Sequence, residues 1–365
     1  MNLDKLKSKL QSSVKGTHIE ILSDSKIASE RTWFPTPSYD LNRILSGSLF
    51  KGLPSKSLTL LVAPEASFKS SFMCLCAARA QQKEGYTPII IDTEGAWTSD
   101  FVERWGLDPD NILYIYTPWV DKVCVLLGQI IDDDEQDKMF LILDSLGGLE
   151  KIKMIDDAVG KDKRVKADQG TLQKEIKRML KMFLNIVKGK DSVGMMAGHF
   201  FGNPNSYGTA DEIGGGKFAK LAPDIIISQK KVPIYLDPKA KASDRVVIGS
   251  EIKALTLKNR FYPPFQEATI SIDYKNGIDP YAGLLDMALQ CGIIQVGGAW
   301  YTLPDGSKVQ GAVNVREWFK ENPDDILNEL EKILESSGYS TMNEEVAEAM
   351  KMAADEEKED EKKKN

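Results

Sequence analysis

Short runs of aliphatic residues alternate with longer helical segments through the first two thirds of the chain. The first run, Leu58–Ala63, is apolar or β-branched throughout, which is typical of a strand buried on both faces. Later runs of the same kind lie at 88–92, 111–115, 139–144, 193–197 and 225–227. Continuous apolar strands separated by helices predict an α/β fold with a mostly parallel central sheet, covered by helices on both faces.

The two ends of the chain follow other patterns. Residues 1–16 predict a short basic amphipathic helix, and residues 17–22 predict an exposed strand that forms an edge of its own domain or pairs with a neighbouring subunit. Residues 251–272 predict two further strands, and residues 281–337 predict a small, mostly helical region with one hairpin. The resulting division is an arm over 1–28, a core over 29–280, a small C-terminal region over 281–340 and a charged, disordered tail over 341–365.

A turn and a Lys-Ser pair follow the first strand directly, and a helix follows them. This order is typical of a phosphate-binding loop, in which backbone amides and the helix N-terminus receive phosphate, the lysine reaches the outer phosphates and a hydroxyl holds Mg²⁺. The residues of the loop are Pro64, Glu65, Ala66, Ser67, Phe68, Lys69, Ser70 and Ser71. Ala63 and Phe68 stand where glycines are expected, and glycine before the lysine would give the backbone free φ. The loop by itself is equally compatible with an ordinary strand, turn and helix.

Polar residues end the strands that follow. Glu94 comes just after the second strand, Asp144 ends the fourth and His199 follows the fifth. Asp144 suits a carboxylate that holds Mg²⁺, Glu94 suits a general base that orients water, and His199 suits a sensor of the outermost phosphate. Each residue alone is more simply a turn cap, a solvated carboxylate or a structural histidine, but together, beside a Lys-Ser loop, they predict a nucleotide-hydrolysing site at one sheet edge.

Two long polar segments leave the same region of the predicted sheet. Residues 156–170 are charged, and residues 200–217 are rich in Gly, Asn and Ser. Loops of this length inside a compact domain are usually functional, and basic groups, glycine amides and an aromatic suit single-stranded nucleic acid. The candidate DNA-binding residues are Lys161, Lys163, Arg164, Lys166, Lys174, Lys177, Arg178, Phe201, Gly202, Asn203, Tyr207, Gly214, Gly215, Gly216 and Lys217. For the lysines at helical spacing alone, a solvated helix face is the simpler interpretation.

Charge is distributed unevenly along the chain. Residues 321–365 carry 15 acidic and 6 basic residues, so the net charge of −7 is a property of the end of the chain, and the first 320 residues are nearly neutral. The four cysteines show no metal-ligand spacing, and no apolar stretch reaches the length of a membrane span or forms a signal peptide. We therefore expect a soluble, cytoplasmic protein with reduced thiols and no membrane partner.

Taken together, these residues resemble the RecA family of recombinases, most closely its bacteriophage UvsX branch, from about residue 29 to residue 298. In that family the phosphate loop has the form PxxSxKS, as Pro64, Ser67, Lys69 and Ser70 do here, and the phage branch also places Phe before the lysine. The resemblance implies that Lys69 and Ser70 bind ATP and Mg²⁺, Asp144 holds Mg²⁺ and Glu94 activates water. It also implies that His199 links the phosphates to the DNA loops and that Phe101 packs on adenine.

The same resemblance assigns the two polar segments to DNA-binding loops. Lys258 and Arg260 resemble a family Lys-Asn-Lys that reaches the ATP bound to the adjacent subunit, which would make ATP binding and filament assembly one equilibrium. The implied function is an ATP-dependent DNA strand-exchange recombinase, a DNA-dependent ATPase of recombination, repair and replication. It would form a helical homo-filament on single-stranded DNA, pair it with duplex DNA, and work with a single-strand-binding protein and a loading mediator in a host bacterium's cytoplasm.

Two other functions remain compatible with these residues. A hexameric RecA-like helicase or motor would share the ATP residues but close into a ring. A recombination mediator would bind DNA with little turnover, an alternative that Ala63 and Phe68 in the loop keep open.

Overall fold

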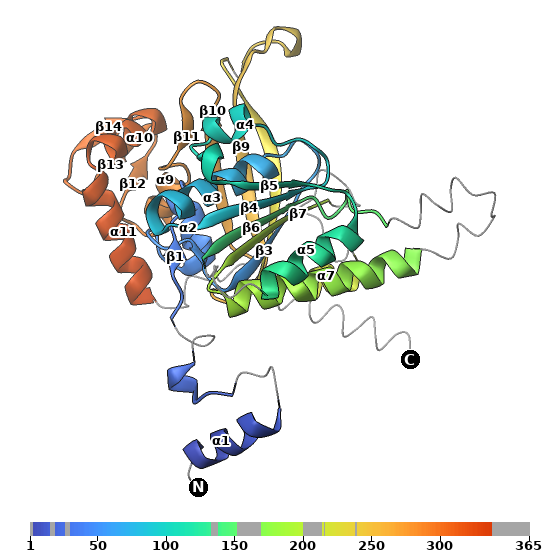
Figure 1. Ribbon diagram of the computed structural model, residues 1–365. Helices are drawn as coiled ribbons and strands as arrows, with labels where there is room; N and C mark the ends of the chain where they lie inside the picture. The colour runs from blue at the N-terminus through green and yellow to red at the C-terminus, as the bar shows by residue number, and fades with distance from the viewer. Residues whose placement is uncertain are drawn as a thin grey trace, which may run out of the picture.

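The computed structural model describes residues 3–14, 19–25, 30–132, 138–151, 169–199, 214, 216–237 and 239–337 (Figure 1). Its centre is a nine-stranded sheet in the order β11-β10-β9-β8-β3-β7-β6-β4-β5, in which β8, β3, β7, β6, β4 and β5 are parallel and β9, β10 and β11 are antiparallel. The strands are β3 (Ser57–Val62), β4 (Thr87–Asp92), β5 (Leu113–Tyr116), β6 (Met139–Asp144), β7 (Val193–Gly198), β8 (Ile225–Tyr235), β9 (Val247–Asn259), β10 (Glu267–Asp273) and β11 (Gly277–Asp279). The predicted mostly parallel α/β sheet is confirmed.

The burial of the strands explains the hydrophobic pattern. β3, β6 and β7 are buried at every position, because helices cover both of their faces. β9 and β10 instead alternate between buried and partly exposed residues, so one face of the antiparallel half packs on the core and the other is accessible.

Helices cover the parallel half on two sides (Figure 1). On one face, α2 (Tyr39–Ser46) and α3 (Lys69–Glu84) contribute Leu41, Ile44 and Phe72 to a buried cluster. On the other, α5 (Val120–Asp132) and α7 (Gln169–Gly189) contribute Leu127 and Phe183 to a second cluster. Shorter helices α4 (Ser99–Arg104) and α8 (Lys217–Leu221) lie beside β4 and β8 in the sequence.

A small C-terminal region has its own core. It contains α9 (Leu284–Gln290), a three-stranded sheet and the helices α10 (Ala312–Glu321) and α11 (Pro323–Ser337), with the strands β12 (Gln295–Gly297), β13 (Trp300–Thr302) and β14 (Lys308–Gln310). Leu49, which follows α2, packs into this core beside Phe319. The carboxylate of Glu331 on α11 accepts hydrogen bonds from the Leu49 amide (2.7 Å) and the Ser48 hydroxyl, which ties α11 to the large sheet's domain.

The N-terminal segment differs in part from the sequence-based expectation. A helix forms as expected, as α1 (Leu3–Ser13), and none of its residues is buried. The strand expected over 17–22 is not present in its described part: residues 19–21 have no regular structure and Leu22–Asp24 form a 3₁₀ turn. A lone strand has no ladder partner within a single chain, so its backbone groups gain nothing from an extended conformation. A two-stranded pair, β1 (Trp33–Phe34) and β2 (Leu53–Pro54), brackets α2 instead.

Among the helices of the described ranges, none combines the length and apolar character needed to cross a bilayer.

Candidate functional site: a phosphate-binding loop and its surroundings

The loop between β3 and α3 has the backbone conformation that a phosphate-binding turn requires. Phe68 lies in the left-handed region at φ 73°, and Ala66 does so at φ 54°. A left-handed φ costs an L residue with a side chain about 1–2 kcal/mol, so a residue other than glycine destabilises the loop at these positions. The Phe68 ring offsets it by packing edge-on against Trp105, with ring centroids 5.3 Å apart, and against the core.

Lys69 is the first residue of α3 and is buried. Its ammonium donates to the backbone carbonyls of Ala63 (3.1 Å) and Pro64 (2.8 Å). Burial lowers the pKa of Lys69, while the nearby carboxylates of Asp144, Glu94 and Glu65 act in the opposite direction. The lysine is therefore a desolvated cation held across the loop, where an anionic ligand would be bound strongly.

Ser70 and Asp144 meet directly at the next position. The Ser70 hydroxyl donates to Asp144 Oδ2 at 2.5 Å, and the indole N–H of Trp97 donates to the same oxygen at 2.9 Å. Burial raises the pKa of Asp144, and the two donated hydrogen bonds lower it. A hydroxyl oxygen beside a carboxylate is the type of oxygen donor set that Mg²⁺ shares with nucleotide phosphates, so these two residues fit that ion.

Glu94 and His199 lie at the same end of the sheet. Glu94 Oε1 accepts a 2.6 Å hydrogen bond from the Ser145 hydroxyl and lies 4.0 Å from His199 Nε2. Gly147 lies under the imidazole, since a Cβ on it would be 3.0 Å from His199 Cδ2. The carbonyl of His199 accepts from the amide of Gly214, so the carboxylate, the histidine and the end of the 200–217 segment are contiguous.

Asp92 shapes the turn that carries Glu94, a role the strand pattern did not reveal. Its Oδ1 accepts from the amides of Glu94 (2.9 Å) and Gly95 (2.8 Å). Its Oδ2 accepts from the amide of Trp97 (3.1 Å) and the hydroxyl of Tyr114 (3.0 Å). The pKa of Tyr114 is raised to about 12, mainly by burial and then by this hydrogen bond. The only sequence signal was a carboxylate at a strand end before a turn.

The phosphate loop, Glu94, Asp144 and His199 line one cavity of about 510 Å³, a volume typical of a small-molecule site. Two aromatic residues at its wall, Trp105 and Tyr274, come from segments that carried no signal in the sequence. Lys231 of β8 also lines it and donates to the carbonyl of Ala66 (3.2 Å). Phe101, the residue expected to pack on adenine, lies edge-on to Trp97 with ring centroids 5.3 Å apart, outside the wall of this cavity. The full lining is Glu65, Ala66, Ser67, Phe68, Lys69, Ser70, Ser71, Glu94, Trp105, Asp144, His199, Lys231, Ser250, Ile252, Ile272 and Tyr274.

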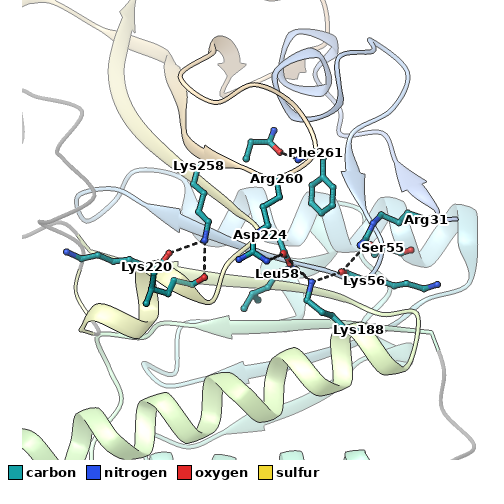
Figure 2. A network of polar contacts seen from close by, with 12 residues as sticks. Arg31, Ser55, Lys56, Leu58, Lys188, Lys220, Asp224, Lys258, Arg260 and Phe261 are labelled. Atoms are coloured by element: carbon teal, nitrogen blue, oxygen red, sulfur yellow. Dashed lines mark hydrogen bonds and ion pairs between the residues drawn. The ribbon is translucent and has the colours of Figure 1, made fainter. Parts of the chain in front are cut away.

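Lys258 and Arg260 lie at the end of the sheet opposite the phosphate loop. The amide of Arg260 donates to the carbonyl of Asp224, whose own amide donates to the carbonyl of Leu58, the second residue of β3, whereas the phosphate loop follows the end of β3. Lys258 donates to the carbonyls of Lys220 (3.3 Å) and Leu221 (2.9 Å), and Arg260 pairs with Asp224 at 3.0 Å (Figure 2). Burial and the charge of Arg260 lower the pKa of Lys258, and Asp224 opposes them. Neither cation belongs to its own chain's cavity.

The candidate DNA-binding residues divide into two groups. Lys161, Lys163, Arg164, Lys166, Phe201, Gly202, Asn203, Tyr207 and Gly215 lie outside the described residues. The others lie where the two segments rejoin the fold. Lys174, Lys177 and Arg178 are exposed on α7, and the Lys177 ammonium lies 5.8 Å from the ring centroid of Phe218 on α8.

Gly216 begins α8, next to exposed Lys217. It has φ 81°, and a Cβ there would lie 2.2 Å from Gln173 Oε1 on α7. The ends of the two polar segments are therefore adjacent, and the positive φ of Gly216 favours glycine at this position.

The fold and the cavity together define an α/β protein with a phosphate-binding loop between a central strand and a helix. Comparison with known proteins narrows this class. The family model for the RecA N-terminal domain matches residues 6–279, and the model for the RecA C-terminal domain matches residues 282–337. The chain belongs to the RecA family.

Similar proteins include the protein RecA of Saccharopolyspora erythraea, which is 28% identical over 82% of this chain and 81% of its own length. The protein RecA of Nocardioides sp. is 27% identical over 81% of each chain. The protein RecA of Rickettsia massiliae is 26% identical over 84% of this chain and 88% of its own. Because these identities are low, the individual site residues rest on the geometry above.

Proposed function

We propose that this protein is an ATP-dependent DNA strand-exchange recombinase that uses Mg²⁺, assembles on single-stranded DNA and hydrolyses ATP between subunits. The observation that carries this proposal is the continuity from Glu94 through His199 to Gly214. It joins a candidate hydrolytic carboxylate to the base of a glycine-rich segment.

The cavity supplies the groups that phosphoryl transfer to water needs. The N-terminus of α3 has Phe68 before it, which offers no side-chain acceptor, so the first amides of the helix can receive phosphate oxygens. Lys69 would exchange its two carbonyl partners for phosphate, and Ser70 with Asp144 would hold Mg²⁺, which supplies charge neutralisation at the phosphates. Glu94, fixed by Ser145 and Asp92, would orient the attacking water.

The base of the nucleotide fits the aromatic part of the same cavity. Trp105 and Tyr274 offer flat apolar surface, and Ile252 and Ile272 complete it. We propose that Phe101 contributes to binding of the base from beside the cavity, where its ring packs against Trp97.

Assembly between copies accounts for two further features. Lys258 and Arg260 lie across the sheet from their own loop, so they suit the nucleotide of an adjacent copy. At the lateral edge of the sheet, β5 exposes Leu113 (52%) and Tyr116 (61%), and no strand of the described residues pairs with its outer side. Such an edge accepts an extended segment from another chain, and the 17–22 segment is our candidate for it.

DNA binding is assigned to the two polar segments and to the helices that follow them. Lys174, Lys177, Arg178 and Lys217 provide positive charge where these segments meet, which suits a phosphate backbone. We also propose that the protein belongs to the phage UvsX branch of the family and works with a single-strand-binding protein and a loading mediator.

The test is ATP hydrolysis by the purified chain, with and without single-stranded DNA. We expect strong stimulation by DNA and its loss in Lys69→Ala, which should also lose nucleotide-dependent DNA binding. Equal rates with and without DNA would contradict the recombinase and favour a motor with another trigger. Binding of DNA without any hydrolysis would favour a mediator.

A further inference from the structure

A buried carboxylate, that of Asp224, binds Lys188 and Arg260 at the end of the sheet opposite the nucleotide cavity. Asp224 immediately precedes β8, and its side chain is 2% exposed. Its amide donates to the carbonyl of Leu58 (2.8 Å), and its Oδ2 accepts from the amide of Leu58 (3.1 Å). Asp224 is therefore pinned to β3, the strand that leads into the phosphate loop.

Two cations share this carboxylate from opposite sides. Figure 2 shows Asp224 between Arg260 and Lys188, which comes from α7. Lys188 Nζ lies 3.0 Å from Oδ2, and Arg260 Nη1 lies 3.0 Å from Oδ1. The amide of Arg260 also donates to the carbonyl of Asp224 (3.1 Å), so backbone and side chain of the arginine are both held.

The geometry leaves the arginine available for a second ligand. Arg260 is 54% exposed although one terminal nitrogen is bound, and a guanidinium carries five N–H donors in a fixed plane. The hydrogen bond from Nη1 to the Asp224 carboxylate restricts the orientation of the guanidinium, and so the direction of its remaining donors.

The charge of the cluster also favours an anion. Asp224 carries one negative charge against two positive charges from Lys188 and Arg260, so the cluster keeps a net positive charge. Lys258, whose ammonium lies at the end of α8, adds to it. Without Lys188, the charge of Arg260 alone would be cancelled by the carboxylate of Asp224.

We propose that Asp224 is a positioning residue that aims the guanidinium of Arg260 at the phosphates of the nucleotide bound to an adjacent copy, with Lys188 preserving the positive charge of the cluster. This inference rests on the proposed action of Arg260 between subunits. It adds a carboxylate and a lysine that touch no nucleotide themselves and act through the arginine.

The experiment compares Asp224→Asn with Arg260→Ala and a matched control, Asp191→Asn. Asp191 is a carboxylate beside β7 that accepts from Ser55 (2.8 Å) and lies 4.0 Å from Lys56, so it tests the loss of another paired carboxylate. Asp224→Asn should bind a fluorescent ATP analogue as the unchanged protein does when DNA is absent. Its DNA-stimulated hydrolysis should fall about ten-fold or more, because the transition-state contact is no longer aligned. Asp191→Asn should hydrolyse normally.

Mixing subunits separates a positioning role from a structural one. Glu94→Gln subunits should bind nucleotide without hydrolysing it while keeping an intact Arg260. In a random mixture with Asp224→Asn, about one interface in four joins an intact hydrolytic site to an intact arginine, so hydrolysis should rise above that of either variant alone. Activity that mixing does not restore would overturn the proposal, as would normal hydrolysis by Asp224→Asn when Arg260→Ala is inactive. If Arg260→Ala itself hydrolyses normally, the intersubunit role fails and the inference fails with it.

Lys188→Gln provides a second variant in case Asp224→Asn melts at too low a temperature to assay. It leaves the anchor of Arg260 in place and removes one charge. We expect a higher ATP concentration for half-maximal hydrolysis with an unchanged maximal rate, and an unchanged half-maximal concentration would refute the charge argument.

Discussion

The left-handed conformation of Phe68 makes a measurable prediction about stability. Phe68→Ala keeps the unfavourable φ of 73° and removes the ring from Trp105 and the core. Truncation of a fully buried Phe costs about 3–5 kcal/mol, and Phe68 is only partly buried, so we expect a loss of about 2 kcal/mol. Phe68→Gly loses the same ring but relieves the backbone, so it should be about 1 kcal/mol more stable than Phe68→Ala.

The assay is urea unfolding followed by circular dichroism, with nucleotide binding measured in parallel. Ala66→Gly is the matched control, because Ala66 also has positive φ (54°) but is exposed and has little packing to lose. It should be as stable as the unchanged protein or more stable. Both Phe68 variants should still bind a fluorescent ATP analogue. If Phe68→Ala is as stable as Phe68→Gly, the backbone at this position carries no strain and the reasoning is wrong.

Three further predictions follow from the site and the fold. Glu94→Gln should retain nucleotide binding and assembly on DNA but lower hydrolysis at least about a hundred-fold, and undiminished turnover would remove Glu94 from its role. Lys231→Gln should weaken ATP binding several-fold, most at low salt, whereas Lys239→Gln in the same hairpin should not; equal effects would show a general charge contribution. Gly283→Ala should lower the melting temperature far more than Gly277→Ala, although both have φ 85°, because only the Cβ at 283 meets Asp40 Oδ2 at 2.1 Å. Similar melting temperatures would show that Asp40 moves aside.

The parallel half of the fold could be predicted because its signal is local. Strands such as Ser57–Val62 and Met139–Asp144 are apolar at nearly every position, and the polar residues that end them must share one edge of a parallel sheet. Lys69, Ser70, Glu94, Asp144 and His199 accordingly line a single cavity.

The rest of the site depends on contacts between distant segments. Tyr274 and Lys231 reach the cavity only because the strands β8, β9 and β10 extend the sheet beside β3, and no short-range pattern specifies that packing. Trp97 and Phe101 are close in sequence, yet the tertiary fold decides that Trp97 bonds Asp144 while Phe101 packs behind it. The strand expected near residue 19 has no partner strand among the described residues, and a strand pattern alone does not supply one.

The strand β3 has a consequence for how the chain tolerates changes of length. At one end Leu58 binds Asp224, and five and six residues further on, the carbonyls of Ala63 and Pro64 bind Lys69. A strand is fully extended and rises about 3.3 Å per residue, so its length fixes the distance between the Asp224 cluster at one end of the sheet and the phosphate loop at the other. A one-residue insertion would reverse the facing of every following side chain and shift both edges against each other. The strand can therefore change its side chains but not its length, and a deletion or insertion there should be absent from working copies of this chain.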